Sequence, residues 1–501
     1  MAEPFYITTA ISYPNGRPHI GHAYEAIAAD AMARFRRAQG RDVMFITGTD
    51  EHGLKMVQTA RAAGRDTHEF ATEMSAYFKE MGQKLNISYD RFLRTSDDVH
   101  HEASKAIWKA MEASGDLYLD RYEGWYSVRD EAFYDESELV AGEVGEKLSP
   151  QGTPVEWTAE ETWFFRLSNY QDKLLNLYRD RPDFILPESR RNEVIRFVEG
   201  GLKDLSVSRT SFDWGVPVPG SPGHVMYVWV DALTTYMTAV GYPEREGDFA
   251  RYWPADVHLI GKDIVRFHAV YWPAFLMSAG LPLPRQVFGH GFILAKSGEK
   301  MSKSAGNVVD PMAMADRYGV DALRYFLLRE VSFGQDGSYS HEAIVNRVNS
   351  ELANSFGNLA QRSLSMVFKN LDGVLPAAGE AEEDRLLLDQ VARGCQELGK
   401  EFDRFAFSVG LEAWMSAVFA CNAYVDAAAP WALKKTDPQR MAAVLGTLVV
   451  AVRQLAEAVA PVIPGSAEKL MALIDGGKDG TSIGQPTPVF PRLEMEEEEA
   501  A

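Results

Sequence analysis

Two histidines near the amino terminus, His19 and His22, stand three residues apart with Gly21 between them. On a helix, this spacing places both imidazoles on one face. The amino end of a helix favours a phosphate, because its N–H groups are unpaired and its dipole is positive there. Gly21 would let a nucleotide approach the backbone closely, and the imidazoles would add hydrogen-bond donors. The alternative interpretation is a capped helix with two polar surface histidines.

A second cluster, Lys300-Met301-Ser302-Lys303-Ser304, reads as a basic loop of small and polar residues. Lys300 and Lys303 could fold over a polyphosphate and neutralise the charge of a departing pyrophosphate. The alternative interpretation is a solvated surface loop without a ligand.

The elements that must position these side chains follow from the apolar pattern. Residues 5–12 are extended and apolar, residues 20–35 carry apolar side chains at helical spacing, and residues 42–49 read as a second buried strand. Such a βαβ unit implies a parallel sheet with its ligand crevice at the carboxyl ends of the strands. Asp50 follows the second strand and should lie at that edge. Apolar segments at 224–233, 256–264 and 286–295 indicate a second α/β half.

Two further regions depart from this pattern. Residues 117–209 contain short aromatic strands with Gly/Pro turns and read as an insertion into the α/β domain. Beyond residue 340, apolar residues recur at helical spacing, for example over 411–419 and 441–455, and predict a helical bundle. The expected fold is therefore α/β: a Rossmann-type parallel-sheet domain with an inserted domain, followed by an all-α helical domain.

Composition restricts the classes of function. Lys plus Arg total 51 against 71 for Asp plus Glu, and the net charge of −20 argues against a sequence-independent grip on a polyanion. With two cysteines, the chain has neither a disulfide framework nor a zinc site built mainly from thiolates. No apolar run approaches the about 20 residues of a membrane span, and the amino terminus lacks targeting features. We expect a cytoplasmic protein that does not bind membranes.

The two motifs, in this order on two α/β halves, resemble the signature pair of the class I aminoacyl-tRNA synthetases. Within that class, the resemblance is to the methionyl-tRNA synthetase family and covers nearly the whole chain. It is carried by the segments Tyr13–Gly16, Gly48–Gly53, Tyr227–Ala232 and Gly261–His268. The isoleucyl, leucyl and valyl families share both motifs, but their inserted editing domains would not fit into residues 117–209.

The resemblance implies a methionine–tRNA ligase. Such an enzyme activates L-methionine with Mg·ATP to give methionyl-adenylate and pyrophosphate, then transfers methionine to the 3′ end of tRNA(Met) and releases AMP. His19 and His22 would stabilise the α-phosphate, and Lys300 and Lys303 the leaving pyrophosphate. The implied ATP-binding residues are His19, Gly21, His22, Gly261, Asp263, Lys300 and Lys303.

The resemblance also implies the methionine-binding residues: Ala10, Ile11, Tyr13, Asp50, Trp229, Ala232, Tyr236, Ile264 and His268. The residue types suit the ligand, because a carboxylate can hold the α-ammonium and aromatic and aliphatic side chains can enclose a thioether. Each aromatic residue alone fits a core role as well. Together they are hereafter called the methionine set.

For tRNA, the resemblance assigns the CAU anticodon to Asn358, Arg362 and Trp431, called the anticodon set below. Asn358 and Arg362 are four residues apart and would face the same way on a helix, and an aromatic side chain can stack on an unpaired base. For Trp431, a place in the bundle core stays an alternative.

The insertion departs from the family pattern, since Ser127, Asp130, Ser149 and Gly152 stand where many relatives carry zinc-binding cysteines. We therefore expect no structural zinc. We expect a monomer, because the chain shows no additional carboxy-terminal domain of the kind that dimerises some relatives. The implied division is a first catalytic Rossmann half (1–116), a connective insertion without a zinc knuckle (117–209), a second catalytic half (210–295), the lysine loop with a linker fold (296–350), and a helical anticodon-binding domain with an acidic tail (351–501).

Two other functions remain open at this point. A small-molecule nucleotidyltransferase shares the histidine motif at a helix end, but it has no use for the long helical domain. A catalytically inert tRNA-binding or scaffold protein would need neither the two motifs nor Asp50.

Overall fold

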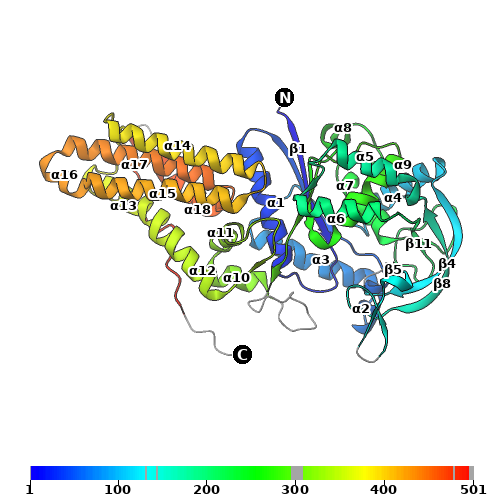
Figure 1. Ribbon diagram of the computed structural model, residues 1–501. Helices are drawn as coiled ribbons and strands as arrows, with labels where there is room; N and C mark the ends of the chain where they lie inside the picture. Colours follow the sequence, from blue (N-terminus) through cyan, green and yellow to red (C-terminus); the bar gives the residue numbers. More distant parts are fainter. Residues whose placement is uncertain (1, 130–131, 143–144, 295–308, 478–479, 496–501) are drawn as a thin grey trace. The chain divides into compact units, whose positions relative to one another are not determined.

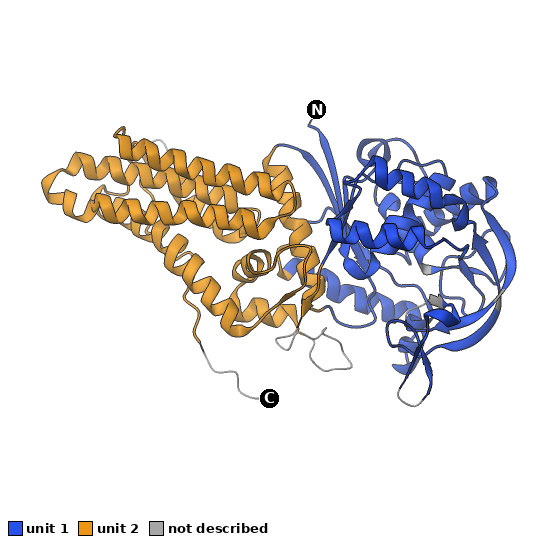
Figure 2. Cartoon of the chain, in the orientation of Figure 1, with its two compact units in different colours: residues 1–18, 40–83, 88–290 blue, residues 19–39, 84–87, 291–501 orange. Residues whose placement is uncertain are grey.

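The structure is a computed structural model that describes residues 2–129, 132–142, 145–294, 309–477 and 480–495. The chain divides into two compact units, shown in different colours in Figure 2. The first comprises residues 1–18, 40–83 and 88–290, and the second comprises residues 19–39, 84–87 and 291–501. The division into domains made from the sequence is not tested by these units and stays a prediction.

A six-stranded parallel sheet forms the centre of the first unit. Its order is β3 (Arg91–Arg94), β2 (Asp42–Thr49), β1 (Pro4–Ser12), β13 (Val257–Gly261), β14 (Val287–His290) and β9 (Ile185–Leu186). The parallel sheet expected from the sequence is thus confirmed. Because Ser12 is paired with Thr49, the residues that follow β1 and β2 leave the same edge of the sheet side by side.

Helices and short strands complete this α/β part of the unit. The apolar segment 224–233 contains a two-residue strand and the first half of a helix, which agrees with the expected second α/β half. The elements are α2 (Leu54–Ala62), α3 (Thr67–Lys84), α4 (Asp98–Ala113), α5 (Gln171–Asp180), α6 (Glu188–Glu199), α7 (Val228–Thr238), α8 (Asp248–Tyr252), α9 (Trp272–Ser278), β11 (Ser208–Arg209), β12 (Val225–Met226), and the short helices η2 (Leu167–Tyr170), η3 (Lys262–Ile264) and η4 (Phe267–Tyr271).

The insertion forms an antiparallel sheet of its own within the first unit. Its order is β10 (Leu205–Ser206), β8 (Glu156–Phe165), β4 (Leu117–Ser127) and β5 (Ala132–Tyr134). The long pair β4 and β8 aligns aromatic residues across the strands, as in the edge-to-face contact of Trp125 and Trp157 at 5.3 Å between ring centroids. The smaller elements are η1 (Glu136–Glu138), β6 (Val140–Ala141) and β7 (Lys147–Leu148).

The second unit is mostly helical, as the sequence predicts for residues beyond 340. Helices α14, α15 and α17 run beside one another as the long helices of the bundle in Figure 1. The elements of this unit are α1 (Ile20–Ala38), β15 (Ile293–Leu294), α10 (Pro311–Tyr318), α11 (Val320–Glu330), β16 (Gly337–Ser338), α12 (His341–Arg347), the π-helix η6 (Val348–Gly357), α13 (Asn358–Asn370), α14 (Glu382–Phe402), α15 (Phe407–Ala428), α16 (Pro430–Thr436), α17 (Pro438–Val459) and α18 (Pro464–Asp475).

Helix α17 corrects one statement made from the sequence. It is long enough and apolar enough to cross a membrane by length and composition, although the sequence analysis found no such run. The reason for its composition is its place in the bundle, where it packs against α13, α14, α15, α16 and α18. A helix surrounded by other helices is apolar on most of its circumference. In α17, 61% of the most apolar stretch is buried.

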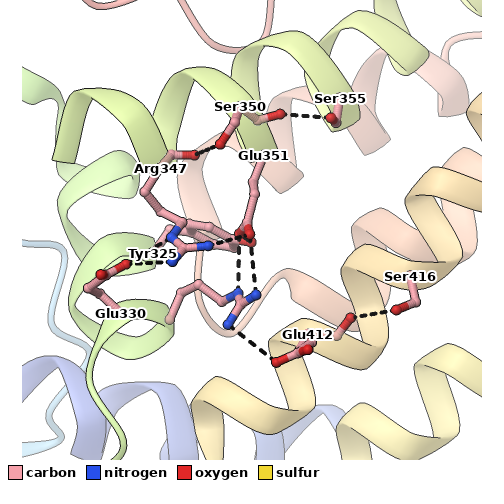
Figure 3. A network of polar contacts seen from close by, with 9 residues as sticks. Tyr325, Glu330, Arg347, Ser350, Glu351, Ser355, Glu412 and Ser416 are labelled. Atoms are coloured by element: carbon pink, nitrogen blue, oxygen red, sulfur yellow. Dashed lines mark hydrogen bonds and ion pairs between the residues drawn. The ribbon is translucent and has the colours of Figure 1, made fainter. Parts of the chain in front are cut away.

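A buried carboxylate, Glu351 of η6, joins four elements of the second unit (Figure 3). Tyr325 donates its hydroxyl to Glu351 Oε2 at 2.6 Å, and Arg347 donates to Oε1 at 2.7 Å. Arg329 contacts both Glu351 and, at 3.8 Å, Glu412 of α15. The network therefore ties α11 and α12 to η6 and α15.

Candidate active site

The two histidines of the first motif cap helix α1. His19 is the N-cap residue, and its Nδ1 accepts a hydrogen bond from Gly21 N at 3.1 Å. His22 Nδ1 accepts in turn from His19 N at 3.1 Å, so each imidazole satisfies a backbone N–H at the helix end. The ring centroids are 3.8 Å apart, which confirms the shared face that the spacing predicts.

This capping geometry determines which nitrogen of each imidazole carries the proton. Because Nδ1 accepts from a backbone amide in each residue, the neutral imidazole carries its proton on Nε2. Both histidines then present Nε2–H donors, as an anionic phosphate requires. Gly21 fits closely, because a Cβ at this position would approach His19 Cε1 to 2.9 Å. A larger residue would displace the His19 ring.

Helix α1 is anchored within the second unit by a buried ion pair. Arg324 Nη2 contacts Asp30 Oδ2 at 2.6 Å, and both side chains are completely buried. The guanidinium also donates to the carbonyl oxygens of Leu85, Pro461 and Val462 at 2.9 to 3.1 Å. These bonds satisfy the buried charge and hold the helix that carries the histidines.

In the first unit, Asp50 follows β2 at the carboxyl edge of the sheet, as expected from the sequence. It is 6% exposed, and its N–H donates to Ser12 O at 2.9 Å, so the ends of β1 and β2 stay together. The next residue, Glu51, is fully buried and receives two hydrogen bonds from Arg94, at 2.7 and 2.9 Å. Burial by itself would raise the pKa of the Glu51 carboxyl, but hydrogen bonds from Arg94, Ser75 and Ser96 lower it below its ordinary value.

Three residues of the methionine set form a chain of hydrogen bonds. Tyr236 and His268 are each 1% exposed, and the Tyr236 hydroxyl lies 2.6 Å from His268 Nε2. His268 Nδ1 lies 3.0 Å from the carbonyl oxygen of Ile264, which can only accept, so Nδ1 carries the proton and Nε2 accepts from Tyr236. Burial lowers the pKa of His268 to about 4, and the ring is neutral at neutral pH.

The other members of the methionine set come from three neighbouring elements. Trp229 of α7 stacks on Phe267 with ring centroids 3.6 Å apart. The Tyr13 hydroxyl accepts from Met56 N at 2.9 Å, which fixes the turn after β1. The remaining residues of the set are the buried Ala10 and Ala232 and the half-buried Ile11.

Two predicted nucleotide-binding residues lie at the end of β13. Gly261 is the last residue of this strand, and Asp263 belongs to η3 directly after it. A Cβ on Gly261 would lie 2.7 Å from Asp263 Oδ1, so the carboxylate folds over the glycine. An acceptor at the carboxyl end of a central strand suits a ribose hydroxyl. Lys300 and Lys303 lie outside the described residues.

The anticodon set belongs to the second unit and is accessible. Trp431 is 50% exposed, so the bundle-core interpretation is wrong. The Arg362 guanidinium carbon lies 5.6 Å from the centroid of the Trp431 ring, within the range of a cation–π contact. Asn358 begins α13 one turn before Arg362 and is exposed. Asn358 and Trp431 are thus exposed, and Arg362 is partly exposed.

The insertion contains a cluster of hydroxyls that includes Ser127 and Ser149, two of the positions compared above with zinc-binding cysteines. The buried Thr153 Oγ1 lies 2.6 Å from Ser127 Oγ and 2.8 Å from Ser149 Oγ. Hydroxyls are poor zinc ligands compared with thiolates and imidazoles. Among the described residues, no group of three or more His, Cys, Asp or Glu side chains is arranged to hold a metal ion. Asp130 lies outside the described residues.

Sequence reasoning used Asp50 but missed its neighbours. His52 and Asp231 form a buried pair, and Phe267 covers Trp229. The available signal was a run of charged residues, Asp50, Glu51 and His52, between an apolar strand and a glycine. Charged residues in such a place are buried only when they have partners.

Two known family models match most of the chain. The family model described as "tRNA synthetases class I (M)" matches residues 5–364, and the model "Anticodon binding domain of methionyl tRNA ligase" matches residues 375–486. The chain is 56% identical to the methionine–tRNA ligase of Brucella suis, over 98% of each chain. It belongs to the methionyl-tRNA synthetase family. The predicted family is thereby confirmed, and so is its activity, the ATP-dependent ligation of methionine to tRNA by a class I synthetase.

Solved methionyl-tRNA synthetases confirm the fold class as well. The Mycobacterium tuberculosis methionyl-tRNA synthetase in complex with methionyl-adenylate is 55% identical, with a TM-score of 0.94 over 98% of this chain and 100% of that one. The free form of the Mycobacterium tuberculosis enzyme matches with a TM-score of 0.88 and 52% identity over 99% of each chain. Family membership decides against the nucleotidyltransferase and the inert scaffold.

Proposed function

We propose that His19 and His22 stabilise the α-phosphate of ATP while the methionine carboxylate attacks it. The observation that carries this assignment is the capping geometry, which places the proton of each neutral ring on Nε2. Preorganised donors of this kind stabilise charge that develops in the transition state. Mg²⁺ enters with ATP as the Mg·ATP substrate, and Lys300 and Lys303 neutralise the departing pyrophosphate. Gly261 and Asp263 bind the ribose.

The methionine set binds the amino acid. Asp50 pairs with the α-ammonium, and Tyr236, His268, Trp229 and Ile264 surround the thioether. A neutral His268 supports this role, because an uncharged ring can be buried beside an apolar side chain at small cost. Ala10, Ile11, Tyr13 and Ala232 complete the contact surface. No side chain acts as a covalent nucleophile, since the substrates themselves supply the reacting groups.

The anticodon set reads the CAU anticodon of tRNA(Met). Trp431 would stack on an unpaired base, and Arg362 and Asn358 would contact base edges. The exposure of Trp431 supports this role. The enzyme would act in the cytoplasm as a monomer without membrane contact.

Pyrophosphate exchange tests the amino-acid assignment. The enzyme is supplied with Mg·ATP, labelled pyrophosphate and one amino acid at a time, without tRNA. Only methionine should drive incorporation of label into ATP. A response to another amino acid, or none to methionine, would contradict the proposal.

Lys303→Ala tests the role of the lysine loop. Loss of a contact to the leaving group should slow single-turnover adenylate formation by about 30- to 1,000-fold, with little change in methionine binding. Lys296→Ala removes one positive charge from the same segment and serves as the matched control. Unchanged adenylation by the Lys303 variant would refute the role.

The insertion is proposed to hold no zinc, and the hydroxyl cluster of Ser127, Ser149 and Thr153 supports this. Metal analysis of the purified enzyme should find no stoichiometric zinc. Activity should survive a strong chelator once Mg²⁺ is restored. Stoichiometric zinc, or activity that returns only with added zinc, would overturn the proposal.

A further inference from the structure

A buried hydrogen bond connects the strand end that carries Asp50 to the helix that carries Trp229. His52 Nδ1 and Asp231 Oδ2 are 2.6 Å apart, and the two side chains are 2% and 0% exposed. His52 lies two residues after Asp50 in the turn that follows β2. Asp231 lies in the first turn of α7, between Trp229 and Ala232.

The pair is a direct polar link between these two segments. Asp231 Oδ1 is buried and has no hydrogen-bond partner among the described residues, so the carboxylate is directed by its bond to His52. The His52 ring is held by edge contacts with Trp214 at 5.6 Å and His101 at 5.4 Å between centroids. Trp214 Nε1 also donates to the Glu51 carbonyl oxygen at 2.5 Å. The imidazole therefore has little freedom to move away from Asp231.

We propose that His52 and Asp231 are positioning residues for methionine: their bond sets the separation between the Asp50 carboxylate and the Trp229 ring. The inference rests on the proposed roles of Asp50 and Trp229. Methionine has to contact both residues at once, with its ammonium at Asp50 and its side chain near Trp229. A change of the separation by a fraction of an ångström weakens one contact or the other, because binding depends on simultaneous fit.

A purely structural role makes a different prediction. Asp231 stands at the positive end of the α7 dipole, and its charge stabilises the helix there. If that were its whole contribution, breaking the pair would lower the unfolding temperature and would change the apparent KM of methionine and of ATP alike.

The test compares three substitutions in pyrophosphate exchange. His52→Leu removes the donor and should raise the KM for methionine about 10- to 100-fold, with the KM for ATP changed less than twofold. Asp231→Asn keeps volume and an acceptor oxygen but loses the charge, and should raise the same KM about 3- to 10-fold. His52→Asn places an amide nitrogen where Nδ1 was, the same number of bonds from the backbone, and should restore most of the affinity. If His52→Leu does not fold, the other two variants decide.

Tyr170→Phe is the matched control, because it removes a 2.6 Å hydrogen bond to another buried carboxylate, Asp116, of the same unit. It should leave both KM values unchanged. Parallel changes in the two KM values, or a failure of His52→Asn to restore methionine affinity, would overturn the inference. Asp50→Asn distinguishes a failure of the proposed function from a failure of this inference. If Asp50→Asn leaves the KM for methionine unchanged, the proposed role of Asp50 is wrong. If Asp50→Asn raises this KM and His52→Leu does not, only the positioning role of His52 and Asp231 is wrong.

Discussion

The methionine set and the anticodon set are held in opposite ways. Tyr236 and His268 are each 1% exposed and are joined by a hydrogen bond within a chain of polar contacts. Trp431 is 50% exposed, and the partly exposed Arg362 lies over its ring. A small ligand is bound by groups that are fixed before it arrives, whereas a single-stranded loop of RNA needs accessible faces on which its bases can stack. Substitutions in the two sets should therefore affect different steps.

The largest effect is expected for Asp50→Asn. The substitution keeps the volume of the side chain but removes the charge that we propose to face the ammonium of methionine. An uncompensated buried charge costs about 3 to 5 kcal/mol, so kcat/KM for methionine should fall by about 150- to 5,000-fold in pyrophosphate exchange. Binding of tRNA, measured by filter retention, should be unchanged. A fall in tRNA affinity of similar size would show that the two sets are not independent.

Acid should lower the stability of the folded protein through His268, a buried member of the methionine set. Its pKa is about 4 in the folded protein and 6.5 when unperturbed, so the unfolded chain binds the proton more readily between these values. The stability that the neutral ring contributes is present above about pH 6.5 and is lost as the pH falls towards 4, up to about 3 kcal/mol. The difference in unfolding temperature between the wild type and His268→Gln should therefore shrink from pH 7 to pH 4.5. A constant difference would contradict this account.

Trp431→Ala should affect only the step that involves tRNA. Loss of one base-stacking contact costs about 1 to 3 kcal/mol, so the efficiency of aminoacylation should fall roughly 10- to 100-fold. Pyrophosphate exchange should be nearly unchanged. Phe419→Ala removes another half-exposed aromatic residue of the same unit and should change neither activity. If Trp431→Ala impairs both activities and lowers the unfolding temperature, the residue supports the bundle instead.

The smallest effect is the coupling between Arg362 and Trp431. A double-mutant cycle with both alanine variants, followed by aminoacylation, should give a coupling energy of about 0.5 to 1 kcal/mol, as expected for an exposed cation–π contact. Strict additivity would show that Arg362 contacts the RNA without aligning the tryptophan.

The sheet and the place of Asp50 could be predicted because they depend on local patterns. Alternation of strand, helix and strand fixes the parallel sheet, and the end of β2 then carries Asp50 to its ligand edge. The pairing of His52 with Asp231 could not be predicted, since the residues are 179 positions apart and neither belongs to a periodic pattern.

The exposure of Trp431 was undecided for a related reason. Helix α15 ends at Ala428, the next residue Ala429 has a left-handed conformation with φ of 40°, and Pro430 then starts α16. The apolar character of a tryptophan carries no information about such a turn. Helix α17 shows the opposite difficulty, because packing inside a bundle and immersion in lipid favour the same residue types.

The carboxylate of Glu351 has a consequence for anyone who wishes to exchange parts between related enzymes. The boundary at residue 350 looks like a natural place to graft a foreign anticodon-binding domain. It would separate Glu351 from Tyr325, Arg329 and Arg347, which all donate to it. A chimaera cut there leaves two arginines from one parent facing whatever residue the other parent supplies, and it should fold poorly unless that residue is also acidic. Helix η6 ends at Gly357. A graft that begins after this residue takes the three donors and Glu351 from the same parent.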